Sequence, residues 1–558
     1  MEKNRADSNK VFVVGLDGGT FDLVRPWVEQ GCLPTFRRLM EEGMAGDLIV
    51  ELPPGTVPNW PSFMTGKNAG KHGVIHWFTR IRDFSKWSVV NSQSVQAKTV
   101  WEIVASHGKR FVSINVPVTY PPKALDEGLM ITGLLTPPTA KIFTYPPELQ
   151  KEIESAVGRY KVYADEIYRE GKEEKFLASL METLDIRFRT SRYLMDRYPW
   201  DLFMIVFSET DAVQHAFWKF IDPLHPKYDE KMARRFSKGI LQIYQKIDSF
   251  LGEYLKTLTK GTTLIVMSDH GAGPFYKKFY TNNWLIGLGY LTVKKSFTSR
   301  SKYWFFRHGF TLQNIYRLLL KMRLENWRRV VDKKESGESL IRKLFLSYED
   351  VDWETTSAFA FGGFGQIYLN VKDHEGDKRS SASAYKDLQN RIIQSLREVQ
   401  TPDGGALVEQ IHTKENLYSG PHVSVLPDIV FMQKRGYTDP GEYEFFSNKI
   451  FDEGVGASGS HRQNGLCLMW GEKVQSKAAS QLPRIHDLVP TALYLLGLPV
   501  PSDMDGRVLL EALKDDWLDK HPVRYVSPED RPGEEGSSYS QDEEEQIKKT
   551  LRGLGYLG

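Results

Sequence analysis

Short apolar runs, each ending in a polar turn, recur along the first half of the chain. They lie near residues 11–17, 110–116, 201–207 and 262–268. Continuous apolar runs of this length are typical of strands that are buried on both faces. Strand and helix patterns alternate from residue 11 to about 285, which predicts an α/β fold with a mostly parallel sheet sandwiched by helices.

The long distance between two polar motifs predicts an inserted segment. Roughly 190 residues separate His270 from His461, far more than a single crossover between strands requires. We therefore expect the chain to leave the core and return to it. The predicted organisation is a catalytic core at 10–285 and 425–515, an inserted cap subdomain at 286–424, and an acidic linker with a C-terminal docking helix at 516–558.

The C-terminal segment differs in composition from the rest. Ser527 to Glu545 carries eight acids against one arginine, together with Pro, Gly and Ser, which predicts a solvated linker. The closing residues predict a short helix that docks through Leu551, Leu554 and Leu557, and a partner-binding tail is the alternative.

Acidic and histidine side chains stand at the ends of the predicted strands. Asp17 ends the first run before two glycines, and Asp269 with His270 ends the last run in the sequence SDHG. Ligands of open α/β sheets bind at the carboxyl ends of strands, where these residues are expected to gather. Asp211 and His215 are four residues apart and share one helix face, and His461 lies in a glycine-serine loop at 454–465. Each feature is common alone, but together they predict a metal site.

Thr56 is held in a loop between prolines. The sequence PPGTVPN places it just before a predicted helix, whose amino terminus is a ready site for an anion. Asn59, three residues later, has two interpretations. Its amide donates a hydrogen bond to a phosphoryl oxygen, or it serves as an ordinary turn or helix-cap residue.

These motifs resemble the type I phosphodiesterase and nucleotide pyrophosphatase family of the alkaline phosphatase superfamily. The resemblance is strongest to its bacterial and archaeal branch of predicted phosphohydrolases and phosphomutases. It rests on TVPNWPSFMTG around Thr56, the D-x-x-x-H pair, SDHG and the late histidine. It implies an alkaline-phosphatase-like fold with a cap, and two metal ions. One ion would be held by Asp211, His215 and His461, the other by Asp17, Asp269, His270 and Thr56.

The resemblance also implies a reaction and a choice of metal. Thr56 attacks phosphorus, and water then hydrolyses the phosphothreonine. Mixed imidazole and carboxylate ligands favour zinc or manganese over calcium, with zinc as the first choice. Trp60 stands where the diesterases often carry histidine, and no nucleotide-binding pattern is evident. The sequence therefore does not identify the leaving group of the substrate.

Several functions remain in competition with hydrolysis of a phosphodiester. A phosphomutase or phosphotransferase of the same superfamily is one alternative, and a catalytically silent metal-binding partner protein is another. A sulfatase is excluded, because Thr56 is not part of the C/S-x-P-x-R motif. We expect diesters rather than monoesters as substrates, because a monoester's second charge usually requires a further cation. Arg462, adjacent to His461, is the one nearby candidate for binding substrate.

Composition and charge limit the substrates and the cellular location that we expect. A net charge of +2 gives no general attraction to nucleic acid, so a phosphate-ester small molecule or a lipid-like substrate is expected. The two cysteines, Cys32 and Cys467, suit a reducing compartment or a fold that needs no disulfide. The polar first ten residues and the lack of a long apolar run predict a cytoplasmic protein.

One segment is strongly basic. Residues 294–334 contain twelve lysines or arginines and only two acids, interleaved with aromatic side chains. Part of it has helical periodicity, which predicts a cap helix. Its basic side is either a solvated lid or a site for an anionic substrate, an acidic partner or an anionic lipid surface.

Overall fold

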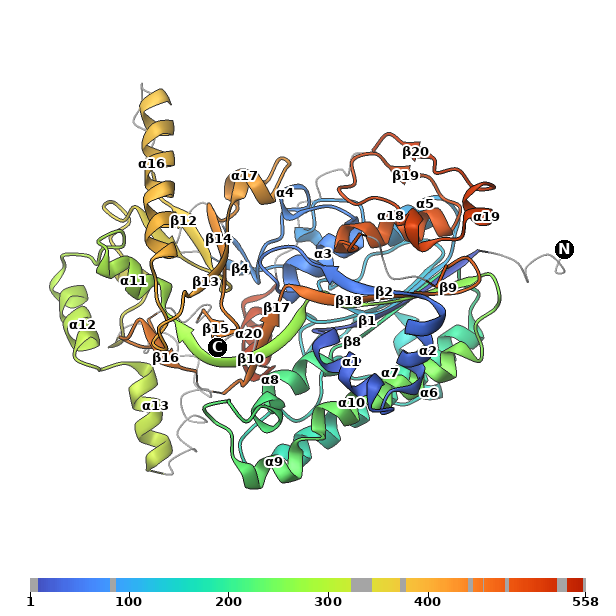
Figure 1. Cartoon of the computed structure of the whole chain (residues 1–558), viewed down its shortest axis with the longest axis horizontal. Helices are drawn as coiled ribbons and strands as arrows, with labels where there is room; N and C mark the ends of the chain where they lie inside the picture. Colours follow the sequence, from blue (N-terminus) through green and yellow to red (C-terminus); the bar gives the residue numbers. More distant parts are fainter. Residues whose placement is uncertain are drawn as a thin grey trace.

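A computed structural model describes residues 9–80, 87–322, 344–371, 378–439, 445–454, 456–476, 481–528 and 539–554. An eight-stranded sheet forms the centre of the molecule (Figure 1). Its strands in spatial order are β2 (Met44–Ile49), β18 (Asn464–Trp470), β9 (Thr262–Met267), β1 (Lys10–Leu16), β8 (Leu202–Phe207), β5 (Phe111–Val116), β6 (Gly128–Thr132) and β7 (Thr144–Tyr145).

The five central strands, from β9 to β6, run parallel, and the others pair antiparallel at the two sides. The α/β class with a mostly parallel sheet, predicted from the sequence, is therefore confirmed. The predicted strands at 11–17, 110–116, 201–207 and 262–268 correspond to β1, β5, β8 and β9.

Helices cover both faces of this sheet (Figure 1). Along β1, Phe12 and Val14 join one hydrophobic cluster, whereas Val11 and Val13 join the other, because successive strand residues point to opposite faces. The first cluster includes residues of α1 (Phe21–Glu29), α2 (Pro34–Glu42), α7 (Glu173–Arg197), α8 (Glu209–Ile221) and α10 (Gly239–Leu255). The second includes residues of α3 (Thr56–Thr65), α5 (Val100–Ser106) and α18 (Leu488–Leu495). Burial on both faces explains why the strands are apolar throughout.

Close packing explains why a large side chain stands at position 60. Its side chain is fully buried, and a Cβ atom added to Gly15 of β1 would lie 2.5 Å from the indole ring. Trp60 therefore fills the space between α3 and the sheet.

Much of the chain between β9 and β18 forms a group of elements at one end of the molecule (Figure 1). An antiparallel sheet in the order β11-β12-β14-β13 is made by β11 (Ala358–Ala360), β12 (Gln366–Leu369), β14 (Ile429–Gln433) and β13 (Val408–Thr413). The helices of this region are α11 (Thr281–Gly287), α12 (Phe297–Arg307), α13 (Leu312–Lys321) and α16 (Lys378–Arg397). Because β14 pairs with β12, this sheet extends past residue 425, the boundary expected from the sequence.

A second small sheet connects this region to the core. It is formed by β10 (Gly271–Phe279), β15 (Gly436–Thr438), β16 (Phe451–Glu453) and β17 (Gly459–Arg462). β10 follows β9 directly, so one continuous segment runs from the central sheet into the added region.

The C-terminal helix α20 (Gln541–Leu554) packs on the core. Ile547 and Leu551 are buried, and Tyr539 just before the helix stacks on Tyr120 with 5.9 Å between ring centroids. Leu554 packs against the same cluster, and Leu557 lies outside the described residues. Among the helices described, none has both the length and the apolar character needed to cross a membrane.

Candidate metal centre

The seven side chains singled out from the sequence meet at one edge of the central sheet. Asp17 follows β1, and Asp269 and His270 follow β9, the strand that pairs with β1. α8 begins just after β8, the other neighbour of β1, and carries Asp211 and His215. His461 reaches the same place through the antiparallel pairing of β17 with β10, and Thr56 is the first residue of α3.

One group of ligand atoms consists of Asp211, His215 and His461. The Nε2 atom of His215 lies 3.3 Å from Asp211 Oδ2, and that of His461 lies 3.5 Å from Asp211 Oδ1. The two imidazole Nε2 atoms are 2.9 Å apart. These three donors are within the spacing from which a metal ion is coordinated.

The second group surrounds the Thr56 hydroxyl. His270 Nε2 lies 3.4 Å from Asp17 Oδ1, 3.4 Å from Asp269 Oδ2 and 3.2 Å from Thr56 Oγ1. Thr56 Oγ1 is also 3.5 Å from Asp17 Oδ1. Asp211 joins both groups, because its ligand atom and those of Asp17 and His270 lie within 4.8 Å of one another.

The three histidines are oriented in the same way. Their Nδ1 atoms contact main-chain carbonyl oxygens: His215 that of Gly459 at 2.8 Å, His461 that of Pro54 at 3.1 Å, and His270 that of Gly271 at 2.9 Å. An Nδ1–H that donates to a carbonyl leaves the lone pair on Nε2, the atom that points into the cluster. This arrangement is typical of imidazoles that bind metal.

Among the residues that the structure describes, no lysine or arginine forms an ion pair with the acids of the cluster. Asp17, Asp211 and Asp269 are buried, and each has one carboxylate oxygen without a hydrogen-bond partner. Burial, and then repulsion from Asp17, raise the pKa of Asp269 well above its usual value. Burial acts against the charge of His270, but Asp269 and Asp17 outweigh it and raise the pKa of that imidazole to about 10. Buried acids with orphaned oxygens fit divalent cations, which would neutralise them.

The Thr56 loop is clamped by Asn59. Its amide nitrogen donates to the carbonyl oxygens of Gly55, Glu51 and Pro53 at 3.0, 3.2 and 3.3 Å, and its oxygen accepts from the Glu51 amide at 2.8 Å. The side chain is fully buried. In this geometry both amide hydrogens are occupied by main-chain oxygens, so none is left for a phosphoryl oxygen.

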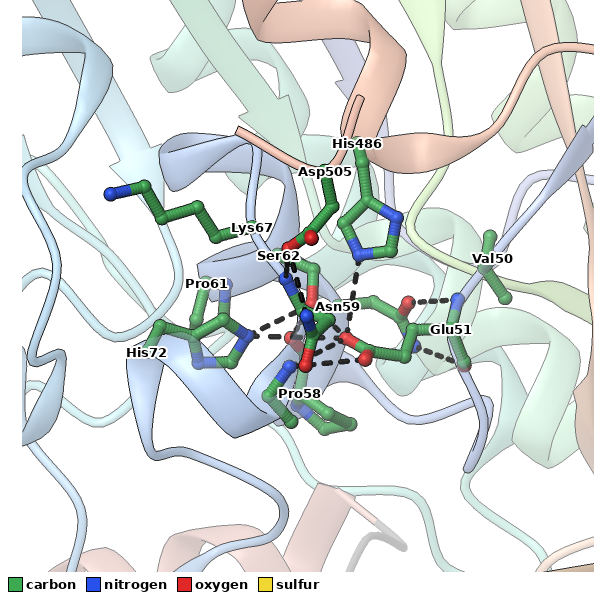
Figure 2. A network of polar contacts seen from close by, with 12 residues as sticks. Val50, Glu51, Pro58, Asn59, Pro61, Ser62, Lys67, His72, His486 and Asp505 are labelled. Carbon is green, nitrogen blue, oxygen red and sulfur yellow. Dashed lines mark hydrogen bonds and ion pairs between the residues drawn. The ribbon is translucent and has the colours of Figure 1, made fainter. Parts of the chain in front are cut away.

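Glu51 forms the centre of a buried polar network behind this loop, as Figure 2 shows. Its carboxylate accepts hydrogen bonds from Ser62 of α3 and from the amide of Ala69, and it lies 3.6 Å from His486 and 4.0 Å from His72. Burial lowers the pKa of His72 to about 4. Burial alone raises the pKa of Glu51, but His486 and then His72 outweigh it and lower that pKa. The network ties α3, which begins at Thr56, to two other segments of the core.

A hairpin of the added region reaches over the cluster. The sequence GGFG at 362–365 connects β11 to β12, and its four residues all have positive φ. The ring of Phe364 stacks on His461 with 4.9 Å between centroids, and the Gly365 amide donates to Asp439 at 2.7 Å. Phe364 is half-buried. The glycines signalled the turn, but nothing local in the sequence indicated its position above His461.

Arg462 points away from the cluster. It follows His461 in β17, and neighbouring strand residues point to opposite faces. Its guanidinium donates to the Gln433 carbonyl at 2.9 Å and pairs with Glu409. The structure therefore brings together the seven metal-ligand candidates but not Arg462.

Comparison with known sequences gives a family match over most of the chain. The sequence profile of a family described as type I phosphodiesterase / nucleotide pyrophosphatase matches residues 11–444, a range that includes six of the seven side chains, all but His461. No match is found among curated protein sequences.

Similar folds occur among solved structures. Phosphonoacetate hydrolase from Sinorhizobium meliloti 1021 aligns in complex with phosphonoacetate (14% identity) and with phosphonoformate (15%). Each alignment has a TM-score of 0.51 and covers 88% of this chain and 96% of the other. Human ectonucleotide pyrophosphatase/phosphodiesterase 5 aligns at 14% identity over 91% of this chain and all of the other, with a TM-score of 0.47. The fold is alkaline-phosphatase-like, and because the family profile spans most of the sequence, the chain belongs to the type I phosphodiesterase/nucleotide pyrophosphatase family.

Proposed function

We propose that this phosphoesterase of the alkaline phosphatase superfamily cleaves phosphodiesters through a covalent phosphothreonine at Thr56. The observation that carries the proposal is the position of the Thr56 hydroxyl, 3.2 Å from His270 Nε2 and 3.5 Å from Asp17 Oδ1. A hydroxyl among buried acids and imidazoles, at the first residue of a helix, is placed to act as a nucleophile.

Two divalent cations, most suitably zinc or else manganese, would be held by the seven side chains described above. One would be bound by Asp211, His215 and His461, the other by Asp17, Asp269, His270 and Thr56. Such cations neutralise the charge of a bound phosphate and lower the pKa of a coordinated hydroxyl.

The chain itself supplies the nucleophile and its orientation. The Thr56 hydroxyl loses its proton to water as its oxygen forms a bond to phosphorus, and the bond from phosphorus to the leaving-group oxygen breaks, so that the leaving group departs and takes up a proton from water. A water molecule then attacks the same phosphorus and gives up a proton, the bond from phosphorus to Thr56 breaks, and the Thr56 oxygen takes up a proton to restore the hydroxyl. The first amides of α3 have no partner within the helix and are oriented to stabilise negative charge beside Thr56.

The charge balance favours a diester. Within the described part of the chain, neither lysine nor arginine forms an ion pair with the seven side chains, and Arg462 is engaged by Glu409. A monoester brings a second negative charge that such a site leaves without a partner. Phe364, stacked on His461, offers an apolar surface to the leaving group.

The test compares an aryl phosphodiester with the corresponding aryl phosphate monoester, after the purified protein has been loaded with zinc or manganese. We expect a higher kcat/KM for the diester and no turnover of either ester by Thr56→Ala. A preference for the monoester that Arg462→Ala removes would instead indicate a phosphomonoesterase or a mutase. No turnover of either ester by the loaded parent would favour a catalytically silent metal-binding protein.

A further inference from the structure

The helices α12 and α13 lie at the end of the molecule opposite the N terminus (Figure 1). They belong to the added region and contribute no side chain to the metal centre. Phe297, Trp304 and Phe305 of α12, with Phe310 in the turn after it, form a surface that we name the aromatic face.

The aromatic face is exposed to an unusual degree. The side chains of Phe297, Trp304, Phe305 and Phe310 are 89%, 57%, 51% and 46% exposed. Elsewhere in the described residues, every phenylalanine and tryptophan is buried or half-buried. Single exposed apolar residues are ordinary, but a group of large ones marks an interaction site.

Three of these rings lie next to one another. Trp304 and Phe305 have centroids 5.1 Å apart, and Phe305 and Phe310 have centroids 6.0 Å apart. Leu318 of α13 and Met322, just after it, are also more than half exposed. The apolar area is therefore concentrated on two consecutive helices, α12 and α13, which we call the α12–α13 segment.

The opposite side of α12 is fixed to the protein. Phe306 is buried, and Ser299 and Lys302 both donate to the carboxylate of Asp350 at 2.8 to 3.2 Å. These contacts fix the orientation of α12 about its own axis, so the aromatic face is directed outward.

Positive charge borders the aromatic face. Lys294, Lys295, Arg300 and Arg307 are exposed, and neither α12 nor α13 contains an acid. Among the residues described, no carboxylate forms an ion pair with Lys295, Arg300 or Arg307. Aromatic rings beside uncompensated cations match the interface of a bilayer, where rings enter the headgroup layer and cations meet anionic headgroups.

We infer that the α12–α13 segment docks this protein on an anionic lipid surface through the aromatic face and the cations around it. An acidic polypeptide would satisfy the cations but not the exposed rings. A single-stranded nucleic acid would stack its bases on the rings but would leave the aliphatic side chains of Leu318 and Met322 in water, whereas an anionic bilayer accommodates the cations, the rings and the aliphatic side chains. The inference is independent of the reaction at Thr56.

The experiment is flotation of the full chain with two kinds of vesicle. One is phosphatidylcholine alone, and in the other about one quarter of the lipid is phosphatidylglycerol. The parent should float with the anionic vesicles, and addition of salt should release it. Arg300→Glu with Arg307→Glu should weaken binding at least about tenfold, because two cations that attract the anionic headgroups are replaced by acids. Trp304→Ser with Phe305→Ser should also weaken it at least about tenfold, because two large rings no longer enter the headgroup layer.

Matched controls separate docking from general stickiness and general charge. Leu224 is 84% exposed and the Lys260 side chain 85% exposed, and both lie outside the α12–α13 segment. Leu224→Ser and Lys260→Glu should bind like the parent, and all variants should keep the parent's unfolding temperature and turnover of an aryl phosphodiester.

Three outcomes would overturn the inference. They are equal binding to both kinds of vesicle, equal binding of the parent and the variants in the α12–α13 segment, and binding to polyglutamate or RNA without binding to anionic vesicles. The last result would assign the α12–α13 segment to an acidic macromolecule.

Discussion

Replacement of Asn59 tests whether the Thr56 loop is held by its neighbours or whether Asn59 contacts the substrate. Asn59→Ala removes the side-chain oxygen, which accepts a hydrogen bond from the Glu51 amide. It also removes the side-chain amide nitrogen, which donates to the carbonyl oxygens of Glu51, Pro53 and Gly55. The site is fully buried, so water cannot replace these partners without rearrangement.

The expected loss of stability follows from those contacts. A buried amide left without a partner costs about 1–3 kcal/mol, and each lost neutral hydrogen bond costs about 1 kcal/mol. The Gly55 carbonyl keeps its bond from the Asn59 main-chain amide at 3.2 Å, which limits the loss. We expect the free energy of unfolding to fall by about 2–4 kcal/mol.

Urea unfolding and steady-state kinetics together decide the question. If Asn59 positions the loop, Asn59→Ala should be destabilised and should lose roughly tenfold in kcat through a displaced Thr56. Asn59→Asp has the same shape but places a carboxylate against the three carbonyl oxygens, so it should be at least as unstable as Asn59→Ala. Parent-like stability with a loss of about 100-fold or more in kcat would refute this reasoning, because that pattern indicates a lost contact with the transition state.

Three further predictions concern the site and its support. Thr56→Ala should keep the fold and lose turnover of an aryl phosphodiester, whereas Thr56→Ser should retain part of it; parent-like rates in Thr56→Ala would contradict a covalent intermediate. His461→Ala should bind one metal ion fewer per chain by elemental analysis and lose nearly all turnover, and an unchanged metal content would contradict its role as a ligand. In the folded protein the pKa of His72 is lowered from 6.5 to about 4. As pH falls from 6.5 towards 4, His72 is therefore protonated in the unfolded chain but not yet in the folded protein. The free energy of unfolding should fall by about 3 kcal/mol across this pH range. His72→Gln should flatten this acid dependence of the urea midpoint, and an unchanged slope would exclude His72 as its cause.

Local patterns in the sequence determined the strands and the placement of the acids. An apolar run that ends in Asp17 or in SDHG defines a buried strand and its carboxyl end without any distant contact. Because parallel strands place their carboxyl ends at one edge, the gathering of these residues also follows from the sequence. The spacing of four residues likewise predicted that Asp211 and His215 lie together on one face of α8.

Only the tertiary structure decided which side chains face the cluster and which support it. Arg462 follows His461 in the sequence, yet strand alternation turns its side chain to Gln433 and Glu409. Phe364 is about a hundred residues before His461, and the hairpin that carries it must pack on the core before the two rings can stack. Such contacts depend on register and packing between distant segments, which periodicity does not encode.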